Sequence, residues 1–320
     1  MEITNNSFCT IVTKDYLAWS LTFYEAIRAF DDAVILNVLV TDVVSANEIS
    51  IGLPVNVIVY TIEDVNKSDI AQKLHEKYKA QPNVLRWSFK PVFMSFLLTK
   101  FDKVIYSDSD IYYCNDYQFL FNELETNNVL LTPHWRSKDP EIDKSNFQLL
   151  FNGGLYNGGF VAANKKGKHI LQFWAKNCLE ICELNLSKGH FADQTHLNLL
   201  PIYFDNVKVL KHRGCNIANW NQIECKRTKN EKTNEVTIQH KYPIVFIHFT
   251  KSTIIGVIKG VDPLLAPYLA KFNTSIVNHG FENLIDKYTS ELSIQRNKSV
   301  KKLQPTLIMK IKMKIKKIIS

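Results

Sequence analysis

Residues 103–116 read KVIYSDSDIYYCND, and this stretch decides which fold the rest of the sequence must fit. The apolar run at 104–106 predicts a buried strand, and two carboxylates, Asp108 and Asp110, follow it directly. Carboxylates two residues apart repel each other, so a positive partner has to offset the repulsion. Either a bound cation supplies that charge, or the aspartates cap a following helix in an ordinary turn.

Strand and helix patterns alternate on the N-terminal side of this stretch. Apolar runs predict strands at residues 7–13, 34–40, 55–60 and 103–107, and apolar residues at helical spacing predict helices at 16–30, 70–79 and 88–98. Such alternation is typical of a mostly parallel sheet with helices on both faces. Ligands of these sheets bind at the carboxyl ends of the strands, which is where Asp108 and Asp110 fall.

The second half of the chain alternates less regularly. Residues 151–163, FNGGLYNGGFVAA, contain two Gly-Gly pairs. We expect helices at 117–127, 168–186 and 190–200, strands at 129–132 and 244–249, a polar loop at 133–150, and a charged hairpin or loop at 227–235. We predict one α/β domain over residues 1–295 and a separate tail at 296–320.

Composition excludes several classes of protein. The formal net charge is +8, but residues 296–320 carry nine basic side chains and no acid, so the rest of the chain has a net charge of about −1. A nucleic-acid-binding surface on the domain is therefore not expected. The N-terminal MEITNNSF lacks a signal-peptide pattern, and no run reaches the roughly 18 apolar residues of a membrane span. Six cysteines without metal-ligand spacing fit reduced, cytoplasmic thiols.

Two common nucleotide-binding motifs are missing from the sequence. No Gly-x-Gly-x-x-Gly opens the first predicted helix and no Walker-type loop occurs, which argues against a dinucleotide cofactor or a phosphate-loop ATPase. Residues 10–19, TIVTKDYLAW, contain no glycine, which argues against a nucleotidyltransferase. Two carboxylates at a strand end nevertheless suit a divalent cation that also holds a diphosphate.

Several short segments form a pattern together. They are CTIVTKDYLAWSLTFYEAI (9–27), VLVTD (38–42), LRWSFKPVFMSFLL (85–98), VIYSDSDI (104–111), FNGGLYNGGFVAAN (151–164), ADQTHLN (192–198), GCNIANWNQ (214–222) and FIHF (246–249). In order and spacing they resemble nucleotide-sugar-dependent glycosyltransferases with the GT-A fold. The likeness is strongest to the family that contains glycogenin and the bacterial lipopolysaccharide galactosyl- and glucosyltransferases, glycosyltransferase family 8.

This resemblance implies a single Rossmann-like GT-A domain, a UDP-hexose donor, Mn²⁺ or Mg²⁺, and retention of the anomeric configuration. It implies that Asp193 holds donor-sugar hydroxyls and that Gln194 lies near the anomeric carbon. Metal ligands would be Asp108, Asp110 and His248, two hard oxygens and one imidazole, a set that suits manganese. Donor contacts would come from Thr10, Val12, Thr13, Tyr16, Lys90, Asp108, Ser109, Asn157 and Gly158. Acceptor contacts would come from Asn152 and Trp220.

The chain departs from the family pattern after His248. The family has a glycine three residues further on and then Lys-Pro-Trp, whereas here Phe-Thr-Lys follows His248 and the next glycine is Gly256. The resemblance therefore does not extend to the phosphate contacts that this loop makes in the family.

Each of these side chains also has an ordinary structural explanation. Lys90 could be a solvated helix lysine, Tyr16 and Trp220 could be core aromatics, and His248 could be a buried histidine at a strand end. Asp193 could cap the next helix, and the repeated Asn-Gly fits ordinary turns. Other functions stay open as well: a nucleotide-sugar hydrolase or other metal-dependent nucleotide enzyme, or a catalytically inactive sugar-nucleotide-binding module.

Residues 296–320, RNKSVKKLQPTLIMKIKMKIKKIIS, form a basic segment of their own. On a helix its isoleucines gather on one side, although the alternating IKMKIK also fits a strand. A basic segment with an apolar face is typical of binding to an anionic membrane surface. We therefore expect a bacterial enzyme on the inner face of the cell membrane, acting on a glycan or lipid-linked acceptor in lipopolysaccharide or other cell-surface polysaccharide synthesis. A disordered tail and a helix packed on a partner chain are the alternatives.

Overall fold

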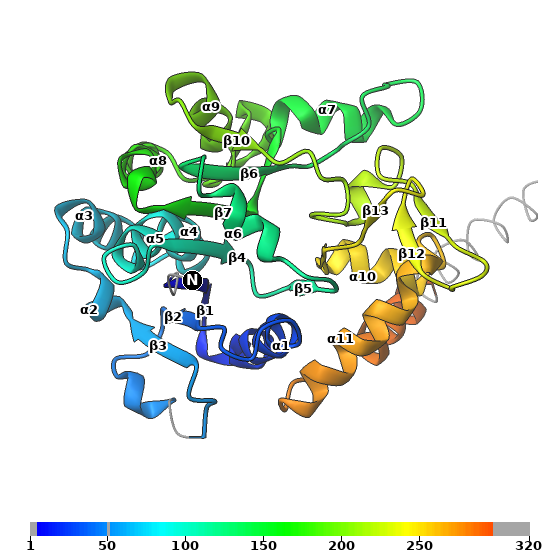
Figure 1. Ribbon diagram of the computed structural model, residues 1–320, viewed down its shortest axis with the longest axis horizontal. Coiled ribbons are helices and arrows are strands. Elements are labelled where there is room, and N and C mark those ends of the chain that lie inside the picture. Colours follow the sequence, from blue (N-terminus) through cyan, green and yellow to red (C-terminus); the bar gives the residue numbers. More distant parts are fainter. Residues whose placement is uncertain (1–4, 50–51, 297–320) are drawn as a thin grey trace, which may run out of the picture.

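The computed structural model describes residues 5–49 and 52–296 (Figure 1). Seven strands form one mixed, mostly parallel sheet in the order β10-β6-β7-β4-β1-β2-β3. β7 runs antiparallel to both of its neighbours, and every other pair is parallel. The strands are β1 (Asn6–Val12), β2 (Leu36–Val40), β3 (Val57–Thr61), β4 (Lys103–Ser107), β6 (Val129–Pro133), β7 (Tyr156–Asn164) and β10 (Val207–Val209). The predicted α/β class is confirmed.

Helices cover both faces of the sheet, which explains why every residue of β2 and β4 is buried. Side chains alternate between the faces, so Phe8 and Val12 of β1 pack on one face and Cys9 and Ile11 on the other. The first face is covered by α1 (Leu17–Arg28) and α6 (Gln118–Glu123). The second is covered by α2 (Ile62–Val65), α3 (Asp69–Tyr78), α4 (Pro82–Ser88), α5 (Lys90–Leu97), α8 (Lys168–Glu180) and α9 (Leu200–Tyr203).

The strand order reverses beside β1. The chain passes from β1 to β2 and β3 on one side, and then crosses to β4 on the other side of β1. The ladder between β1 and β2 extends to the pair Val12 and Val40, whereas the ladder between β1 and β4 ends at Cys9 and Tyr106. The carboxyl ends of β1 and β4 therefore form a topological switch point, the place where open α/β sheets bind ligands.

A second, smaller layer attaches to the sheet directly after the two aspartates. β5 (Ile111–Tyr113) pairs antiparallel with β14 (Phe246–His248), so that His248 lies opposite Ile111. A third core cluster, which includes the stacked rings of Phe249 and Phe272, lies behind this pair. It is built from β11 (Arg227–Lys229), β12 (Val236–Ile238), β13 (Tyr242–Pro243), α10 (Lys251–Ile258) and α11 (Ala266–Asn278), which lie together at the right of Figure 1.

Several predicted elements differ from those in the structure. The expected loop at 133–150 contains the start of α7 (Lys144–Asn152), whose N-cap Asp143 accepts a hydrogen bond from the backbone nitrogen of Asn146 at 3.0 Å. The helix expected at 88–98 corresponds to α5, and a short helix that was not expected, α4, precedes it. The helix expected at 168–186 stops at Glu180, and a small hairpin follows, β8 (Leu184–Asn185) and β9 (His190–Phe191).

Short 3-10 turns connect these elements. They are η1 (Lys14–Tyr16), η2 (Ala46–Glu48), η3 (Lys165–Gly167), η4 (Leu186–Lys188), η5 (Thr195–Leu199), η6 (Asn219–Asn221) and η7 (Pro263–Leu265). The predicted helix at 190–200 is therefore mostly η5, and the glycine-rich segment 151–163 largely becomes β7. Its Gly-Gly pairs are not simply turns, because Gly158 and Gly159 lie inside that strand.

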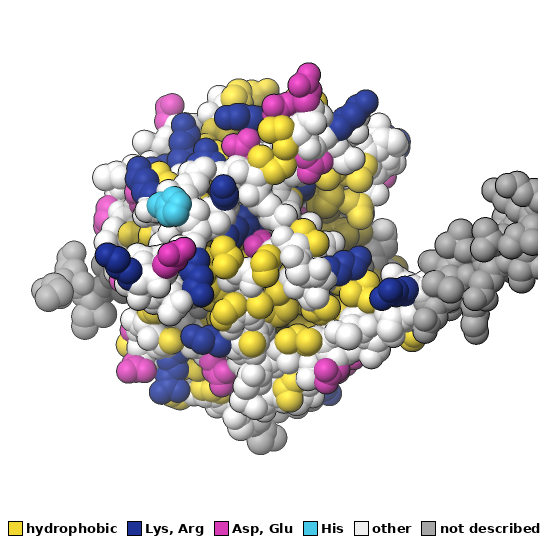
Figure 2. Space-filling view, turned by 90° about the vertical axis from the view of Figure 1, so that its right-hand side faces the viewer, with side chains coloured by type: hydrophobic (Ala, Val, Ile, Leu, Met, Phe, Trp, Pro, Cys, Tyr) yellow, Lys and Arg dark blue, Asp and Glu magenta, His cyan; other side chains and the backbone are white. Residues whose placement is uncertain are grey.

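The predicted membrane-binding tail, residues 296–320, lies outside the described residues except for Arg296. Within residues 5–49 and 52–296, no single helix is long and apolar enough to cross a bilayer, and α10 with Pro263–Asn278 passes that test only as a pair bent by 104°. All six cysteines are free. The face shown in Figure 2 carries a band of hydrophobic side chains across its middle, with basic side chains around it.

Candidate active site

A buried lysine supplies the positive charge that the carboxylates at the end of β4 need. Lys90 begins α5 and is only 4% exposed. Its Nζ lies 3.3 Å from Oδ1 of Asp108 and 3.3 Å from Oδ2 of Asp193, and it donates a hydrogen bond to the carbonyl oxygen of Gly158 at 2.9 Å. The interpretation of Lys90 as a solvated helix lysine is therefore wrong.

Lys90 stands at the first position of α5, beside two carboxylates. Pro91 follows it at the start of α5, where the missing backbone N–H of proline costs nothing. Burial lowers the pKa of Lys90, but the carboxylates of Asp108 and Asp193 outweigh burial and raise it. The lysine therefore stays charged within the protein, and it joins two acidic residues that are far apart in the sequence.

Asp108 is held where β4 leaves the sheet. The Tyr106 hydroxyl donates to its Oδ1 at 2.5 Å, and the Asp108 backbone nitrogen donates to the Gly159 carbonyl oxygen at 2.8 Å. Burial raises the pKa of Asp108, but the charges of Lys90 and His248 outweigh burial and lower it. A strand, β5, follows the aspartates, so the alternative in which they cap a helix is wrong.

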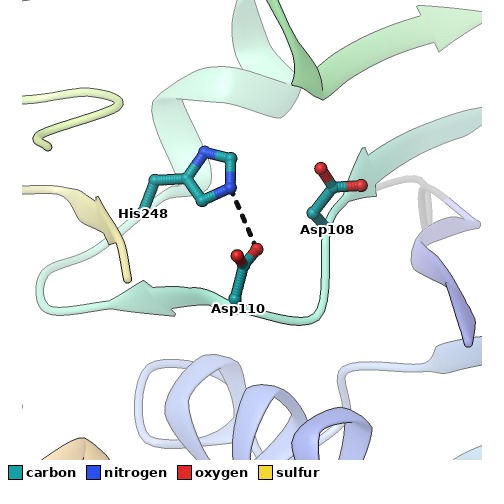
Figure 3. Close-up of side chains that lie close together, drawn as sticks. All are labelled: Asp108, Asp110 and His248. Atoms are coloured by element: carbon teal, nitrogen blue, oxygen red, sulfur yellow. Dashed lines mark ion pairs between the residues drawn. The ribbon is translucent and has the colours of Figure 1, made fainter. Parts of the chain in front are cut away.

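Asp108, Asp110 and His248 form a group of potential metal ligands. One ligand atom from each lies within 4.8 Å of the others. Figure 3 shows Asp110 and His248 facing each other, with Asp108 beside them, and Nε2 of His248 is 2.9 Å from Oδ1 of Asp110. The pairing of β5 with β14 brings the histidine to the aspartates.

The surroundings of this group fit a divalent cation. A Cβ atom at Gly159 would lie 2.6 Å from Cε1 of His248 and 2.9 Å from Oδ2 of Asp108, so only glycine leaves room beside the three ligands. Nδ1 of His248 lies 3.2 Å from Nδ2 of Asn157, a contact that orients the ring. Burial lowers the pKa of His248, but the charges of Asp110 and Asp108 outweigh burial, so that the pKa is raised overall. Two carboxylates and one imidazole suit Mn²⁺, and carboxylates also suit Mg²⁺.

Asp193 and Gln194 lie against the backbone of β7. Oε1 of Gln194 accepts a hydrogen bond from the Gly158 nitrogen at 2.9 Å, and its Nε2 donates to the Gly153 carbonyl oxygen at 2.6 Å. A Cβ atom at Gly158 would lie 3.0 Å from Oδ2 of Asp193. The glycines of this segment therefore let both side chains approach the strand closely.

The Asp193 carboxylate is buried almost without hydrogen bonds. Its Oδ2 has no hydrogen-bond partner among the described residues, and Lys90 is its counter-charge. Burial raises the pKa of Asp193 to about 6, Lys90 opposes this, and Asp108 adds to it. The N-cap interpretation of Asp193 is wrong, because the residue before η5 is Gln194 and no side chain caps that turn.

Two connected cavities contain these groups. A cavity of about 550 Å³ is lined by the metal-ligand group, Asp193 and Gln194, and Trp220 among others. A crevice of about 190 Å³ at the switch point is lined by Ile11, Tyr16 and Ser109 among others. Both are lined by Trp87, Lys90, Asp108 and Asp110, so the crevice opens into the larger cavity at the aspartates.

The structure brings most of the predicted site residues together. The residues that line one or both cavities are Tyr16, Lys90, Asp108, Ser109, Asp110, Asn157, Gly158, Asp193, Gln194, Trp220 and His248. Tyr16 is 42% exposed and Trp220 lines the larger cavity, so neither is simply a core aromatic. His248 does fit the description of a buried histidine with satisfied contacts, and it is also one of the three potential ligands.

Four predicted contacts need correction. Thr10 and Val12 have fully buried side chains, because they point to the face of β1 opposite to that of Ile11, which lines the crevice. Thr13 lines neither cavity, and Asn152 is exposed at the end of α7, outside both. The side chains of Thr10 and Val12 therefore cannot reach a ligand in the crevice.

Sequence reasoning missed other residues of the cavity. Trp87 lies three residues before Lys90, a helical spacing that could have indicated it. His134 and Arg136 lie in the segment that was expected to be only a polar loop, and both are buried. Asn216 lies in the quoted segment 214–222 and lines neither cavity, but it has a positive φ of 63° and accepts a hydrogen bond from Nδ2 of Asn157 at 3.0 Å. No local pattern indicated His134 or Arg136.

Comparisons with known proteins bear on the fold. No protein-family model matches the chain. The uncharacterized proteins YfnF and YfnD of Bacillus subtilis (strain 168) are similar in sequence. YfnF is 23% identical over 258 residues, covering 79% of this chain and 83% of YfnF. YfnD is 29% identical over 177 residues, covering 53% of this chain and 54% of YfnD.

Solved structures of glycosyltransferases share the architecture. The galactosyltransferase LgtC, in complex with donor and acceptor sugar analogs, superposes with a TM-score of 0.51 at 15% identity, covering 86% of this chain and 97% of LgtC. The bifunctional glycosyltransferase WbbM superposes with a TM-score of 0.50 at 15% identity, covering 89% of this chain and 52% of WbbM. The chain therefore has the α/β fold of GT-A-like glycosyltransferases.

Proposed function

We propose that the protein is a metal-dependent glycosyltransferase of the family 8 type. It would move a hexose from UDP to a hydroxyl group of a glycan or lipid-linked acceptor. The observation that carries this proposal is the buried group of Lys90, Asp108 and Asp193 beside the metal-ligand residues, in a cavity at the switch point of the sheet. Burying so many charged side chains destabilises the folded protein. Binding of a polar, highly charged substrate would explain why the site retains them.

The crevice suits the nucleotide part of the donor. Tyr16 offers an exposed aromatic ring at its edge, and an aromatic face suits the uracil base. Thr250 and Ser252, at the N-terminal end of α10, line the larger cavity beside His248. A helix N-terminus favours anions, so this end of α10 replaces the phosphate contacts that the departure after His248 removes.

The charged residues of the site are suited to stabilising the diphosphate as it leaves the sugar. Asp108, Asp110 and His248 would hold Mn²⁺ or Mg²⁺, which neutralises negative charge on the leaving diphosphate. Lys90 adds a fixed positive charge on the other side of Asp108. Because Lys90 also binds the Gly158 carbonyl, its ammonium group keeps one position as the charge on the leaving group develops.

Asp193, Gln194 and Asn157 suit the donor sugar. The Asp193 carboxylate lines the cavity beside Lys90, and a carboxylate can accept a hydrogen bond from a sugar hydroxyl. Both ends of the Gln194 amide are held by backbone groups, and its Oε1 keeps a second lone pair for positive charge at the anomeric carbon. This arrangement supports reaction with retention of configuration.

The outer part of the larger cavity suits an acceptor with apolar surface. Leu149, Leu184, Leu186 and Phe191 line it, and Trp220 offers an apolar ring face. A lipid-linked acceptor would place the enzyme at the inner face of the bacterial membrane, in lipopolysaccharide or related polysaccharide synthesis. The basic tail supports binding to an anionic bilayer.

Release of UDP tests the proposal. The full chain is incubated with UDP-glucose, UDP-galactose or other UDP-hexoses and Mn²⁺, with and without a panel of glycan and lipid-linked acceptors, and with EDTA as a control. We expect acceptor-dependent release of UDP that EDTA abolishes. Equal release without any acceptor would indicate a hydrolase instead. Binding of UDP-sugar in calorimetry without any release would indicate an inactive binding module.

A further inference from the structure

Arg136 is a buried cation that has no acidic partner. It lies in the loop after β6, lines the larger cavity and is only 9% exposed. Its Nη1 donates to Oδ1 of Asn146 at 3.0 Å, while its Nε is buried without a hydrogen-bond partner. Among residues 5–49 and 52–296, no carboxylate lies within ion-pair distance of it. Arg227, which is similarly buried, has Asp262 at 3.0 Å.

An unpaired buried guanidinium needs an explanation. Burial lowers the pKa of Arg136 to about 10, so the side chain still carries its charge at neutral pH. The Trp220 ring, whose centroid is 5.9 Å from Cζ of Arg136, offsets part of the cost through a cation–π contact. An aromatic ring does not neutralise the charge, so Arg136 keeps an uncompensated positive charge at its own end of the cavity, away from the carboxylates that pair with Lys90.

The position of Arg136 separates it from the donor diphosphate. The Trp220 ring contacts Arg136 and also contacts His248, at 5.4 Å between ring centroids, so the indole lies beside both groups. On its other side, a Cβ atom at Gly153 would lie 3.8 Å from Nη2 of Arg136. The carbonyl oxygen of Gly153 accepts the Gln194 amide, so Arg136 adjoins the Gln194 end of the cavity. The metal ligands and Lys90 already account for the diphosphate.

We propose that Arg136 binds an anionic group, a carboxylate or a phosphate, on the acceptor sugar. The proposal rests on the proposed function and names the class of its second substrate. A guanidinium suits both anions, because its planar donors can form two parallel hydrogen bonds to them. The donor sugar is the other source of the same chemistry, if it is a uronic acid. The apolar side chain of Leu149, beside Gly153 at this end of the cavity, favours the acceptor.

Binding measurements on matched sugars test this assignment. Calorimetry with UDP and Mn²⁺ present compares glucose 6-phosphate with glucose, and methyl glucuronide with methyl glucoside. We expect the wild-type protein to bind at least one anionic sugar about tenfold or more tightly than its neutral counterpart. Arg136→Gln should abolish that preference, and Arg136→Lys should keep only part of it, because an ammonium keeps the charge but not the paired geometry.

Arg213→Gln is the matched control. Arg213 also stacks on a tryptophan, with Cζ 4.2 Å from the Trp135 ring centroid, but it has Glu224 within 3.8 Å and does not line the cavity. This variant should keep the anion preference of the wild type. If it loses the preference as fully as Arg136→Gln does, the assignment to Arg136 is overturned. Thermal melts check folding, and Arg136→Lys keeps the test decisive if the glutamine variant does not fold.

A donor comparison separates the two sources of the anion. The same proteins are titrated with UDP-glucuronate and with UDP-glucose in the presence of Mn²⁺. If Arg136→Gln weakens the binding of UDP-glucuronate but not of UDP-glucose, and leaves the binding of the acceptor sugars unchanged, the anion belongs to the donor. The acceptor assignment is then wrong. Equal affinity of the wild type for anionic and neutral acceptor sugars also overturns it. Absence of any UDP-sugar binding would instead contradict the proposed function, so the two failures are distinct.

Discussion

Replacing Asp193 with asparagine is expected to stabilise the folded protein at neutral pH. The Asp193 carboxylate is buried, and burial raises its pKa from 3.8 to about 6. At pH values between 3.8 and about 6, the folded state binds more protons at this carboxyl group than the unfolded state does. The stability contributed by this group therefore falls as pH rises. Asparagine has nearly the same shape and does not titrate, and Lys90 keeps Asp108 and the Gly158 carbonyl as partners.

The size of this effect follows from the two pKa values. The gain in free energy of unfolding is about half a kcal/mol at pH 4, about 2 kcal/mol at pH 5 and about 3 kcal/mol at pH 7. Urea unfolding followed by tryptophan fluorescence, in EDTA and at each of these pH values, measures it. Asp205→Asn is the control, because Asp205 is exposed and its carboxylate stays in water in both states.

A particular result would refute this reasoning. If the stability difference between Asp193→Asn and the wild type is flat across pH 4 to 7, burial of the charge is not what distinguishes Asp193. If the variant is less stable at pH 7, the Lys90 pair outweighs burial, contrary to the direction of the shift. A gain in stability accompanied by lost turnover would indicate that the protein retains an unfavourable carboxylate for its chemistry.

Three further predictions concern the metal-ligand group and the tail. Asp110→Asn should keep the fold, as measured by circular dichroism, but reduce UDP-hexose turnover by roughly 100-fold or more, a loss of about 3 kcal/mol in transition-state stabilisation. Near-normal turnover would show that Asp110 holds no metal. Gly159→Ala should weaken Mn²⁺ binding in calorimetry, because its methyl group would lie 2.6 Å from His248, whereas Gly256→Ala, with nothing within 4 Å, should bind as the wild type does. Deleting residues 296–320 should leave UDP-sugar binding intact and abolish sedimentation with anionic vesicles at low salt; a full-length protein that stays in the supernatant would contradict this.

The sequence predicted the parts of the site that depend on local pattern. Asp108 and Asp110 were identified because an apolar run ends directly before them, and the end of a parallel strand is a fixed place in this kind of sheet. His248 also lies at the end of an apolar run, but its role as a metal ligand was implied by the family resemblance. Its contact with Asp110 at 2.9 Å depends on the pairing of β5 with β14, which no periodicity could indicate.

Other features of the site depend on long-range packing, which sequence reasoning could not predict. The burial of Lys90 depends on contacts with Asp193 and Gly158, which no spacing within residues 85–98 encodes. Thr10 and Val12 were placed on the wrong side of β1, because a strand buried on both faces has no polar alternation to show which side chains meet the ligand. Arg136 was missed because a lone arginine in a polar loop gives no local indication of burial.

The pairing of β5 with β14 has a consequence for how the protein matures. It joins a carboxylate from the first half of the chain to the imidazole of His248, which lies between Ile247 and Phe249 of the third core cluster. Such a distant contact forms late, because the long loop between its ends must close first. A nascent chain that ends before β14 keeps both aspartates but has no histidine to complete the group. Uptake of a divalent ion would therefore mark synthesis beyond β14 and closure of this pairing, and would in turn stabilise that closure.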